Sequence, residues 1–191
     1  LIKLTGAAAP LFPHEAIRRA GEPKTAAAVP PLLRIMTEDD AAARLVAVTA
    51  LNEIGSPSAL QVIERAVDHA ERDVRLAALR ALHARKYRPV LPRIEAAVKG
   101  KALRGANLTE KMAVFELYGM LCGDGGVPHL DEILNGKGFL GRREDPELRA
   151  CAAMALGRIG SRIATDALRK ATTEKEVLVR NAVSRALRSG S

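Results

Sequence analysis

The fold is decided by one stretch of sequence, Asp145-Pro-Glu-Leu-Arg-Ala-Cys-Ala-Ala-Met-Ala-Leu-Gly-Arg-Ile-Gly160. A proline in the first turn of a helix lacks only an N–H group that would have no partner there, and a glycine favours a helix end. The small residues Ala152 and Ala155 lie three positions apart and therefore share one helix face. The stretch predicts an α-helix with a small-residue face.

The same pattern recurs along the chain around a basic residue, which we call the anchor. Apolar residues follow three, six and seven positions after each anchor, and these offsets lie on one side of a helix. A residue type that favours helix starts stands four positions before each anchor. The anchors are Arg44, Arg75, Lys111, Arg149 and Arg180, and the residues before them are Asp40, Glu71, Asn107, Asp145 and Glu176. The recurrence predicts a row of similar helices.

A second helix is predicted before each anchor helix, because a small residue is followed four positions later by a large aliphatic one. These pairs are Ala28/Leu32, Ala59/Ile63, Val90/Ile94, Gly126/Leu130 and Ala164/Leu168. A short helix pair cannot bury both of its faces alone, so neighbouring pairs must stack. We therefore predict an all-α fold, an α-α superhelix (right-handed solenoid) of about five stacked helix pairs. It forms a single domain over 1–191, with an irregular N-terminal cap over 1–23 and repeats over 24–188.

The stretch Asp145–Gly160, with its partial copies within 40–66 and 71–98, resembles the HEAT repeat. The similarity is to the short bacterial form that is also found in phycobilisome-lyase-like HEAT proteins. It implies that the anchors form a structural ladder between adjacent repeats, and a row that binds phosphates is the alternative. The repeat around Lys111 departs from the pattern, because lysine replaces arginine and Phe115 and Tyr118 enlarge a face that is rich in alanine elsewhere.

Composition excludes several classes of protein. Aromatic residues make up only 3% of the 191 residues, which disfavours a β-sandwich. Two cysteines, Cys122 and Cys151, are too few for a disulfide framework or a metal set, and the four histidines are dispersed. We therefore expect no metal and no cofactor. No Gly-x-Ser-x-Gly motif or other catalytic constellation occurs, so we expect no enzymatic activity.

The ends and the hydropathy of the chain bear on its location. No apolar run is long enough to span a membrane, and no signal pattern precedes the repeats. We expect a cytoplasmic protein. Because the chain starts at Leu1 without methionine, we also expect it to be part of a longer protein.

The net charge of +8 is concentrated in one segment, 80–104. This segment holds eight basic residues against the single acid Glu95. It is either a solvated face that keeps the chain soluble or a patch for an anionic partner, such as an acidic protein surface, nucleic acid or phospholipid headgroups. With Tyr87 as its only aromatic residue, it lacks the stacking platforms that single-stranded nucleic acid requires.

The longest departure from the repeat is the loop over 135–144, Asn-Gly-Lys-Gly-Phe-Leu-Gly-Arg-Arg-Glu. It places Phe139 and Leu140 beside Arg142 and Arg143 in glycine-rich backbone. Insertions in solenoids often serve binding. Alternatively, Phe139 folds back and covers the gap between repeats.

The leading functional prediction is a non-catalytic protein–protein interaction scaffold. It binds another protein, with an acidic surface, through the concave face of the second helices and the loop over 135–144. The predicted partner-binding residues are Arg93, Lys99, Lys101, Arg104, Asp131, Phe139, Arg142, Arg143, Arg169 and Lys170. One alternative is a nucleic-acid-binding protein similar to HEAT-like alkylpurine DNA glycosylases, although the chain has no tryptophan to support an extruded base. The other is a bilin-lyase-like HEAT protein, for which no residue matches a lyase site.

Overall fold

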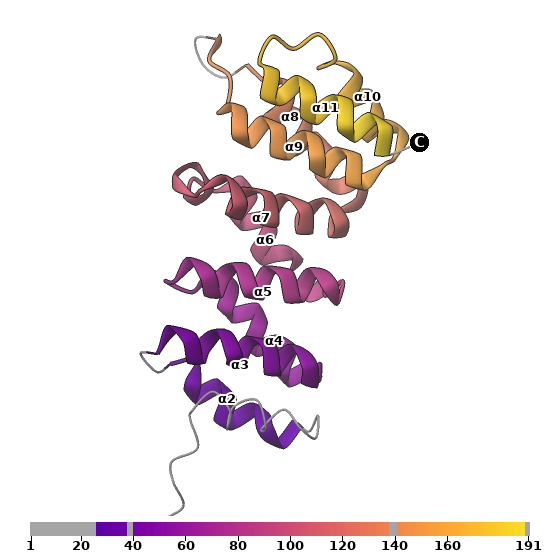
Figure 1. Cartoon of the computed structure of the whole chain (residues 1–191). Coiled ribbons are helices and arrows are strands. Elements are labelled where there is room, and N and C mark those ends of the chain that lie inside the picture. Colours follow the sequence, from indigo (N-terminus) through magenta and orange to yellow (C-terminus); the bar gives the residue numbers. More distant parts are fainter. Residues whose placement is uncertain (1–25, 38–39, 138–140, 190–191) are drawn as a thin grey trace, which may run out of the picture. The chain divides into compact units, whose positions relative to one another are not determined.

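The computed structural model describes residues 26–37, 40–137 and 141–189, and within them the chain is entirely helical with turns (Figure 1). The predicted all-α fold is confirmed, with no strand in the described ranges. The α-helices are α2 (Val29–Ile35), α3 (Ala41–Ile54), α4 (Pro57–Arg65), α5 (Arg72–Ala84), α6 (Leu91–Lys99), α7 (Leu108–Leu121), α8 (Val127–Asn135), α9 (Pro146–Ile159), α10 (Arg162–Arg169) and α11 (Val177–Ser189). Each anchor lies in an odd-numbered helix, and each predicted second helix is an even-numbered one.

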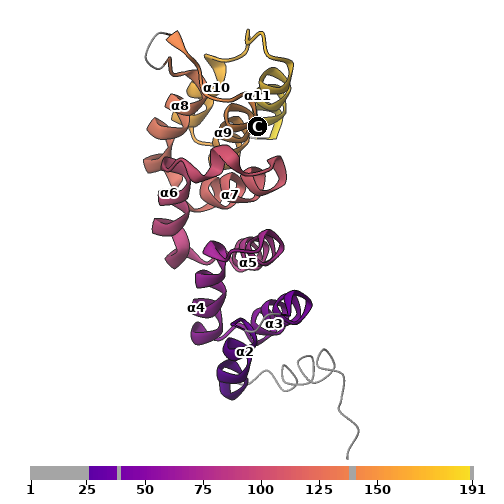
Figure 2. The ribbon, with the colours of Figure 1, turned by 90° about the vertical axis from the view of Figure 1, so that its left-hand side faces the viewer.

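The chain forms two compact units, Leu1–Leu82 and His83–Ser191. In the first unit, α2, α3 and α4 pack against one another. In the second unit, α9 is central and packs against α7, α8, α10 and α11. Within this unit α6 and α8 form one layer, and the anchor helices α7, α9 and α11 form the other (Figure 2).

The core lies where the helical periodicity predicts it. The large aliphatic residue of every second helix is at most 2% exposed, as at Leu32, Ile63, Ile94, Leu130 and Leu168. In the anchor helices, Ala152 and Ala155 of α9 are fully buried. Burial of such apolar surface is the main source of stability in a chain of short helices, because none of these helices is stable alone.

Small residues let α9 approach its neighbours closely. A Cβ atom added at Gly157 would lie 2.7 Å from the Cβ atom of Ala186 in α11. A Cβ atom added at Gly119 of α7 would lie 2.7 Å from the carbonyl oxygen of Ala155. The helix then ends at Gly160, whose φ of 66° is a left-handed conformation that favours glycine.

The predicted helix starts use their side chains in two ways. Asp40 and Asn107 are N-caps, accepting hydrogen bonds from backbone N–H groups in the first turns of α3 and α7. Asp145 precedes α9 but its carboxylate accepts no capping hydrogen bond. Instead, one of its oxygens lies 3.3 Å from Nζ of Lys111. The same sequence position therefore serves as a cap in one repeat and as an ion-pair partner in another.

Candidate functional site

Three anchors connect one anchor helix to the start of the next. Arg44 of α3 pairs with Glu71, which directly precedes α5. Lys111 of α7 is buried, and its Nζ atom lies 2.7 Å from Glu147 and 3.3 Å from Asp145 at the start of α9. The hydrogen bond that Lys111 donates to Glu147 is the largest contribution that raises the pKa of Lys111. The lysine is therefore firmly charged although it is buried.

Arg149 of α9 is the most deeply buried anchor. Its Nη2 atom pairs with Glu174, which precedes α11, and its Nε atom donates a hydrogen bond of 3.0 Å to the carbonyl oxygen of Leu134. Arg143 pairs with the same Glu174 carboxylate. Burial alone would raise the pKa of Glu174, but the hydrogen bonds from Arg149 and the Lys175 amide, with the two guanidinium charges, lower it to about 2.

Arg75 and Arg180 make a different set of contacts. The Nη1 atom of Arg75 donates to the carbonyl oxygens five and six residues before it, at 2.7 and 2.8 Å. The Nη1 atom of Arg180 donates to the equivalent two carbonyl oxygens, at 3.1 and 2.9 Å. Each of these two arginines therefore holds the turn that precedes its own helix.

In the second unit, the basic residues of the segment 80–104 are spread along α6 and beyond both of its ends. Lys86 and Arg88 precede α6, whereas Lys99 is its last residue and Lys101 and Arg104 follow it. A helix of this length separates its ends by about 13 Å. Arg93 is exposed on α6 between the two groups. Lys99 is partly neutralised by Glu95, 2.6 Å away on the same helix.

Three of the predicted binding residues meet at one cavity, which we call the edge cavity. It lies where second helices lead into anchor helices in the second unit, and its volume is about 590 Å³. Its lining includes the predicted Arg104, Arg142 and Arg143, together with Lys137, His129, Glu132, Ile133 and Glu144. Sequence reasoning did not single out Lys137 or His129 as binding residues.

The cations of the edge cavity fall into two groups. Arg104 pairs with Glu144 through contacts of 2.8 and 3.3 Å, which raise the pKa of Arg104 and lower that of Glu144. Arg143 pairs with Glu174. Lys137 and Arg142 are exposed and make no hydrogen bond or ion pair within the described part of the chain. Two positive charges of the cavity are thus uncompensated by any of the described residues.

Several other predicted binding residues do not line this cavity and form ion pairs within the chain. Asp131 of α8 pairs with Lys170 at the end of α10, with 2.6 Å between oxygen and nitrogen. Arg169 pairs with Asp166 of its own helix at 3.2 Å. Lys101 is exposed, and Phe139 lies outside the described residues.

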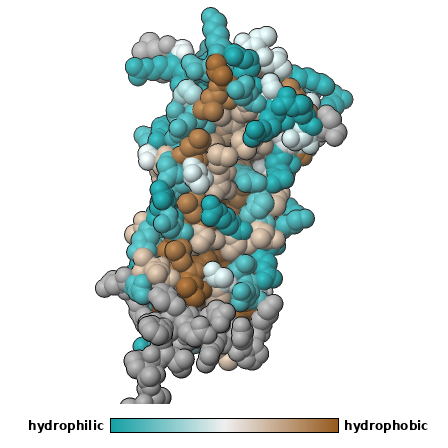
Figure 3. Space-filling model, viewed as in Figure 1, coloured by the Kyte–Doolittle hydropathy of each residue, from teal (hydrophilic) through white to brown (hydrophobic). Residues whose placement is uncertain are grey.

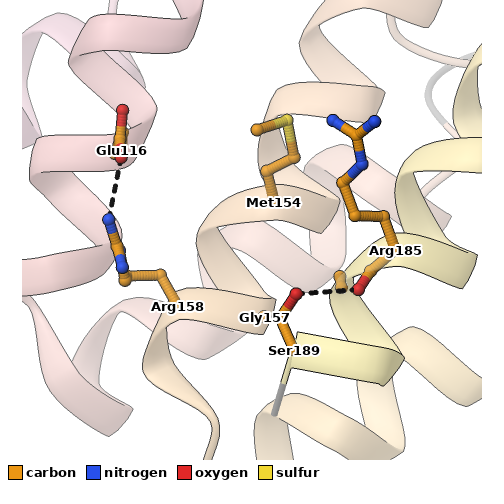
Figure 4. Close-up of a pocket in the computed structure, with 7 residues that line it drawn as sticks. Glu116, Met154, Gly157, Arg158, Arg185 and Ser189 are labelled. Carbon is orange, nitrogen blue, oxygen red and sulfur yellow. Dashed lines mark hydrogen bonds and ion pairs between the residues drawn. The ribbon is translucent and has the colours of Figure 1, made fainter.

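A second concavity lies on the anchor helices of the second unit, and we call it the anchor groove (Figure 4). Its volume is about 310 Å³. Arg158 and Glu116 face each other on one side at 2.8 Å, and Met154 and Arg185 lie on the other. Figure 3 shows apolar residues over the middle of these helices, with hydrophilic residues beside them. The sequence signal for this groove was weak, since its residues come from α7, α9 and α11.

The described residues include neither a group of metal ligands nor a thiol with a lowered pKa. No group of three or more His, Cys, Asp or Glu side chains within them could hold a metal ion. Burial raises the pKa of the Cys122 thiol to about 11 and that of Cys151 to about 12.

Among the helices of the described ranges, none is long and apolar enough to cross a membrane.

The comparisons with known proteins identify the repeat. The model of the HEAT repeats matches residues 1–99 and 138–189. The chain belongs to the HEAT-repeat family. Its fold class is therefore the α solenoid, and HEAT repeats are generally protein-interaction scaffolds. The unmatched residues 100–137 include α7, whose anchor is Lys111 rather than an arginine.

Two solved structures are similar to this chain. An engineered protein is 20% identical, with 93% of this chain and 89% of that chain covered and a TM-score of 0.49. Human deoxyhypusine hydroxylase in complex with glycerol is 20% identical, with 97% and 81% covered and a TM-score of 0.40. The curated proteins contain no match to this HEAT-repeat chain.

Proposed function

We propose that this HEAT-repeat chain is a non-catalytic interaction scaffold that binds an acidic segment of another protein at the edge cavity. The observation that carries the proposal is the pair of uncompensated cations, Lys137 and Arg142, on the wall of a concave site. An acidic partner gains electrostatic attraction there without displacing an existing ion pair. The neighbouring Arg104 and Arg143 are already paired with carboxylates of the chain.

The composition of the cavity wall favours a protein segment over nucleic acid. Glu132 and Glu144 lie in the same lining as Lys137 and Arg142. A continuous phosphate backbone would approach both carboxylates, whereas single side-chain carboxylates can contact the two cations alone. The half-buried Ile133 also offers apolar contact, which suits a peptide better than a phosphate chain.

The cysteines support a role without catalysis. A thiol attacks as its thiolate, and raised pKa values keep both Cys122 and Cys151 protonated near neutral pH. Protonated thiols of this kind are packing residues. The proposal therefore assigns no catalytic residue to the described part of the chain.

Charge reversal at the edge cavity tests the proposal. The variant Lys137→Glu/Arg142→Glu is compared with Arg185→Glu, which reverses an exposed arginine of the anchor groove. Fluorescence anisotropy measures binding of a labelled oligoglutamate peptide at about 50 mM and about 200 mM salt. We expect the double variant to bind at least about tenfold more weakly and Arg185→Glu to bind within about twofold of the unaltered chain.

Two results would contradict this function. One is a loss of binding free energy in the double variant that is no more than twice the loss in Arg185→Glu. Because the double variant changes the net charge by four units and Arg185→Glu by two, that result would mean that the peptide responds only to net charge. The other is tighter binding of a single-stranded oligonucleotide of matched charge than of the peptide, with the same dependence on Lys137 and Arg142. That result would replace the protein partner with nucleic acid.

A further inference from the structure

A small, partly apolar pocket adjoins the edge cavity. Its volume is about 60 Å³, and it shares Arg104, His129, Ile133 and Glu144 with the larger cavity. Because four residues line both spaces, a ligand in one lies next to the other. The pocket is the more enclosed of the two, and its remaining wall is mostly apolar.

The wall of the pocket comes from several elements of the second unit. Val98 lies in α6, Leu103 in the short helix η4 (Ala102–Gly105), Phe115 in α7 and Leu148 in α9, and all four are buried. A single water needs roughly 10–15 Å³ of such space, so the pocket has room for about four waters or for one aliphatic side chain. The part of the wall that these four side chains form holds water poorly, whereas an aliphatic group gains from burial against it.

His129 lies at the junction of the two spaces. Its Nε2 atom is buried and has no hydrogen-bond partner in the described ranges. Its Nδ1 atom lies 3.8 Å from a carboxylate oxygen of Glu132. A buried ring nitrogen without a partner is unfavourable, and a polar group of a ligand that bridges the two spaces could supply the missing partner.

From this arrangement we infer that the edge cavity recognises an aliphatic residue flanked by carboxylates in a partner protein. The aliphatic side chain enters the small pocket past Ile133, and the adjacent carboxylates contact Lys137 and Arg142. The inference rests on the proposed function and adds a sequence preference to it. A purely electrostatic site would bind acidic segments irrespective of their apolar residues.

Three peptides of equal charge test the preference, Gly-Glu-Glu-Leu-Glu-Glu and its analogues with glycine or tryptophan in place of leucine. We expect the leucine peptide to bind about tenfold more tightly than the glycine peptide, because several methylene groups are buried. The tryptophan peptide should gain no such advantage, since its ring is larger than the one aliphatic side chain for which the pocket has room. Equal binding of the leucine and glycine peptides would overturn the inference while leaving the proposed function intact.

Variants of the pocket mouth provide the second arm. Ile133 is half-buried at the shared wall, and Ile133→Phe should narrow the entrance and abolish the preference for leucine while retaining binding of the glycine peptide. Ile163→Phe is the matched control, because Ile163 is exposed on α10 and lines neither space. Thermal unfolding by circular dichroism verifies both folds, and Ile133→Met, whose longer side chain also narrows the entrance, replaces Ile133→Phe if the latter unfolds. A preference for leucine that persists in the variant at position 133 would contradict the inference. Failure of all peptides to bind the unaltered chain would contradict the proposed function itself.

Discussion

Lys111 and Lys137 are two lysines of the same unit in opposite surroundings. Lys111 is buried and contacts two carboxylates, at 2.7 and 3.3 Å. Lys137 is exposed, lines the edge cavity and has no ion pair among the described residues. A buried, paired charge cannot meet a partner and is costly to disrupt, whereas an exposed cation costs little to maintain and keeps its charge available. The two positions therefore separate a lysine that holds the fold from one that we propose contacts a partner.

The largest effect is expected at Arg149, whose side chain is 2% exposed. Replacement by methionine leaves the Glu174 carboxylate and the Leu134 carbonyl with fewer partners in a buried place. We expect Arg149→Met to lower the free energy of unfolding by about 3 to 5 kcal/mol. Urea denaturation followed by circular dichroism measures it. If Arg149→Met lost no more unfolding free energy than Arg142→Met, which changes an exposed residue, the ladder arginine would not differ from the cavity arginine in its contribution to stability.

A smaller loss is expected at Lys111, although this lysine is as well paired. Its partners Asp145 and Glu147 have side chains that are each 40% exposed, so water compensates them partly when the lysine is removed. We expect Lys111→Met to cost about 1 to 3 kcal/mol. Urea denaturation of both variants checks this order. A larger loss of unfolding free energy in Lys111→Met than in Arg149→Met would show that the exposure of the paired carboxylates does not determine the loss.

The ion pair between Arg149 and Glu174 should also make the stability of the fold depend on pH. The pKa of Glu174 is about 2 in the folded chain, below its ordinary value of 4.5. A lowered folded-state pKa stabilises the fold above about pH 4.5, and that contribution is lost as the pH falls towards 2. Glu174→Gln should therefore flatten the decline in unfolding free energy over this interval. If both chains lose stability in parallel between those pH values, Glu174 is not the responsible group.

The smallest effect on stability is expected at the edge cavity. Because Lys137 is exposed and makes no ion pair within the described ranges, Lys137→Met should change the free energy of unfolding by no more than about 0.5 kcal/mol. Differential scanning calorimetry resolves a change of this size. A clear loss of stability would mean that this lysine has a structural role.

The sequence predicted the helices and their buried positions because packing repeats with the helical turn. Leu130 and Ala152 were placed in the core by their spacing, and both are fully buried. The sequence could not predict that Asp145 contacts Lys111 instead of capping its own helix. That choice depends on a lysine that lies 34 residues earlier in the chain.

The candidate site was only partly predictable. Arg104 and Arg142 stood out as basic residues, but their different roles depend on Glu144, which pairs with the first of them. Lys86, Arg88, Lys99 and Lys101 are close in sequence, yet the first two precede α6 and the last two lie at and beyond its other end. His129 has an ordinary helical context, and the buried state of its Nε2 atom follows only from the packing around it.

Our central proposal is that the ladder cations hold the fold and that Lys137 and Arg142 of the edge cavity bind the partner. Its most direct test is the affinity of the leucine-containing acidic peptide for Arg44→Met and for Arg142→Glu, measured where circular dichroism shows both to be folded. Arg44 is a buried ladder residue of the first unit, whereas Arg142 lines the cavity in the second. We predict that Arg44→Met is less stable but binds within about twofold of the unaltered chain, and that Arg142→Glu is equally stable but binds about tenfold more weakly. Equal loss of affinity in the two folded variants would contradict the account.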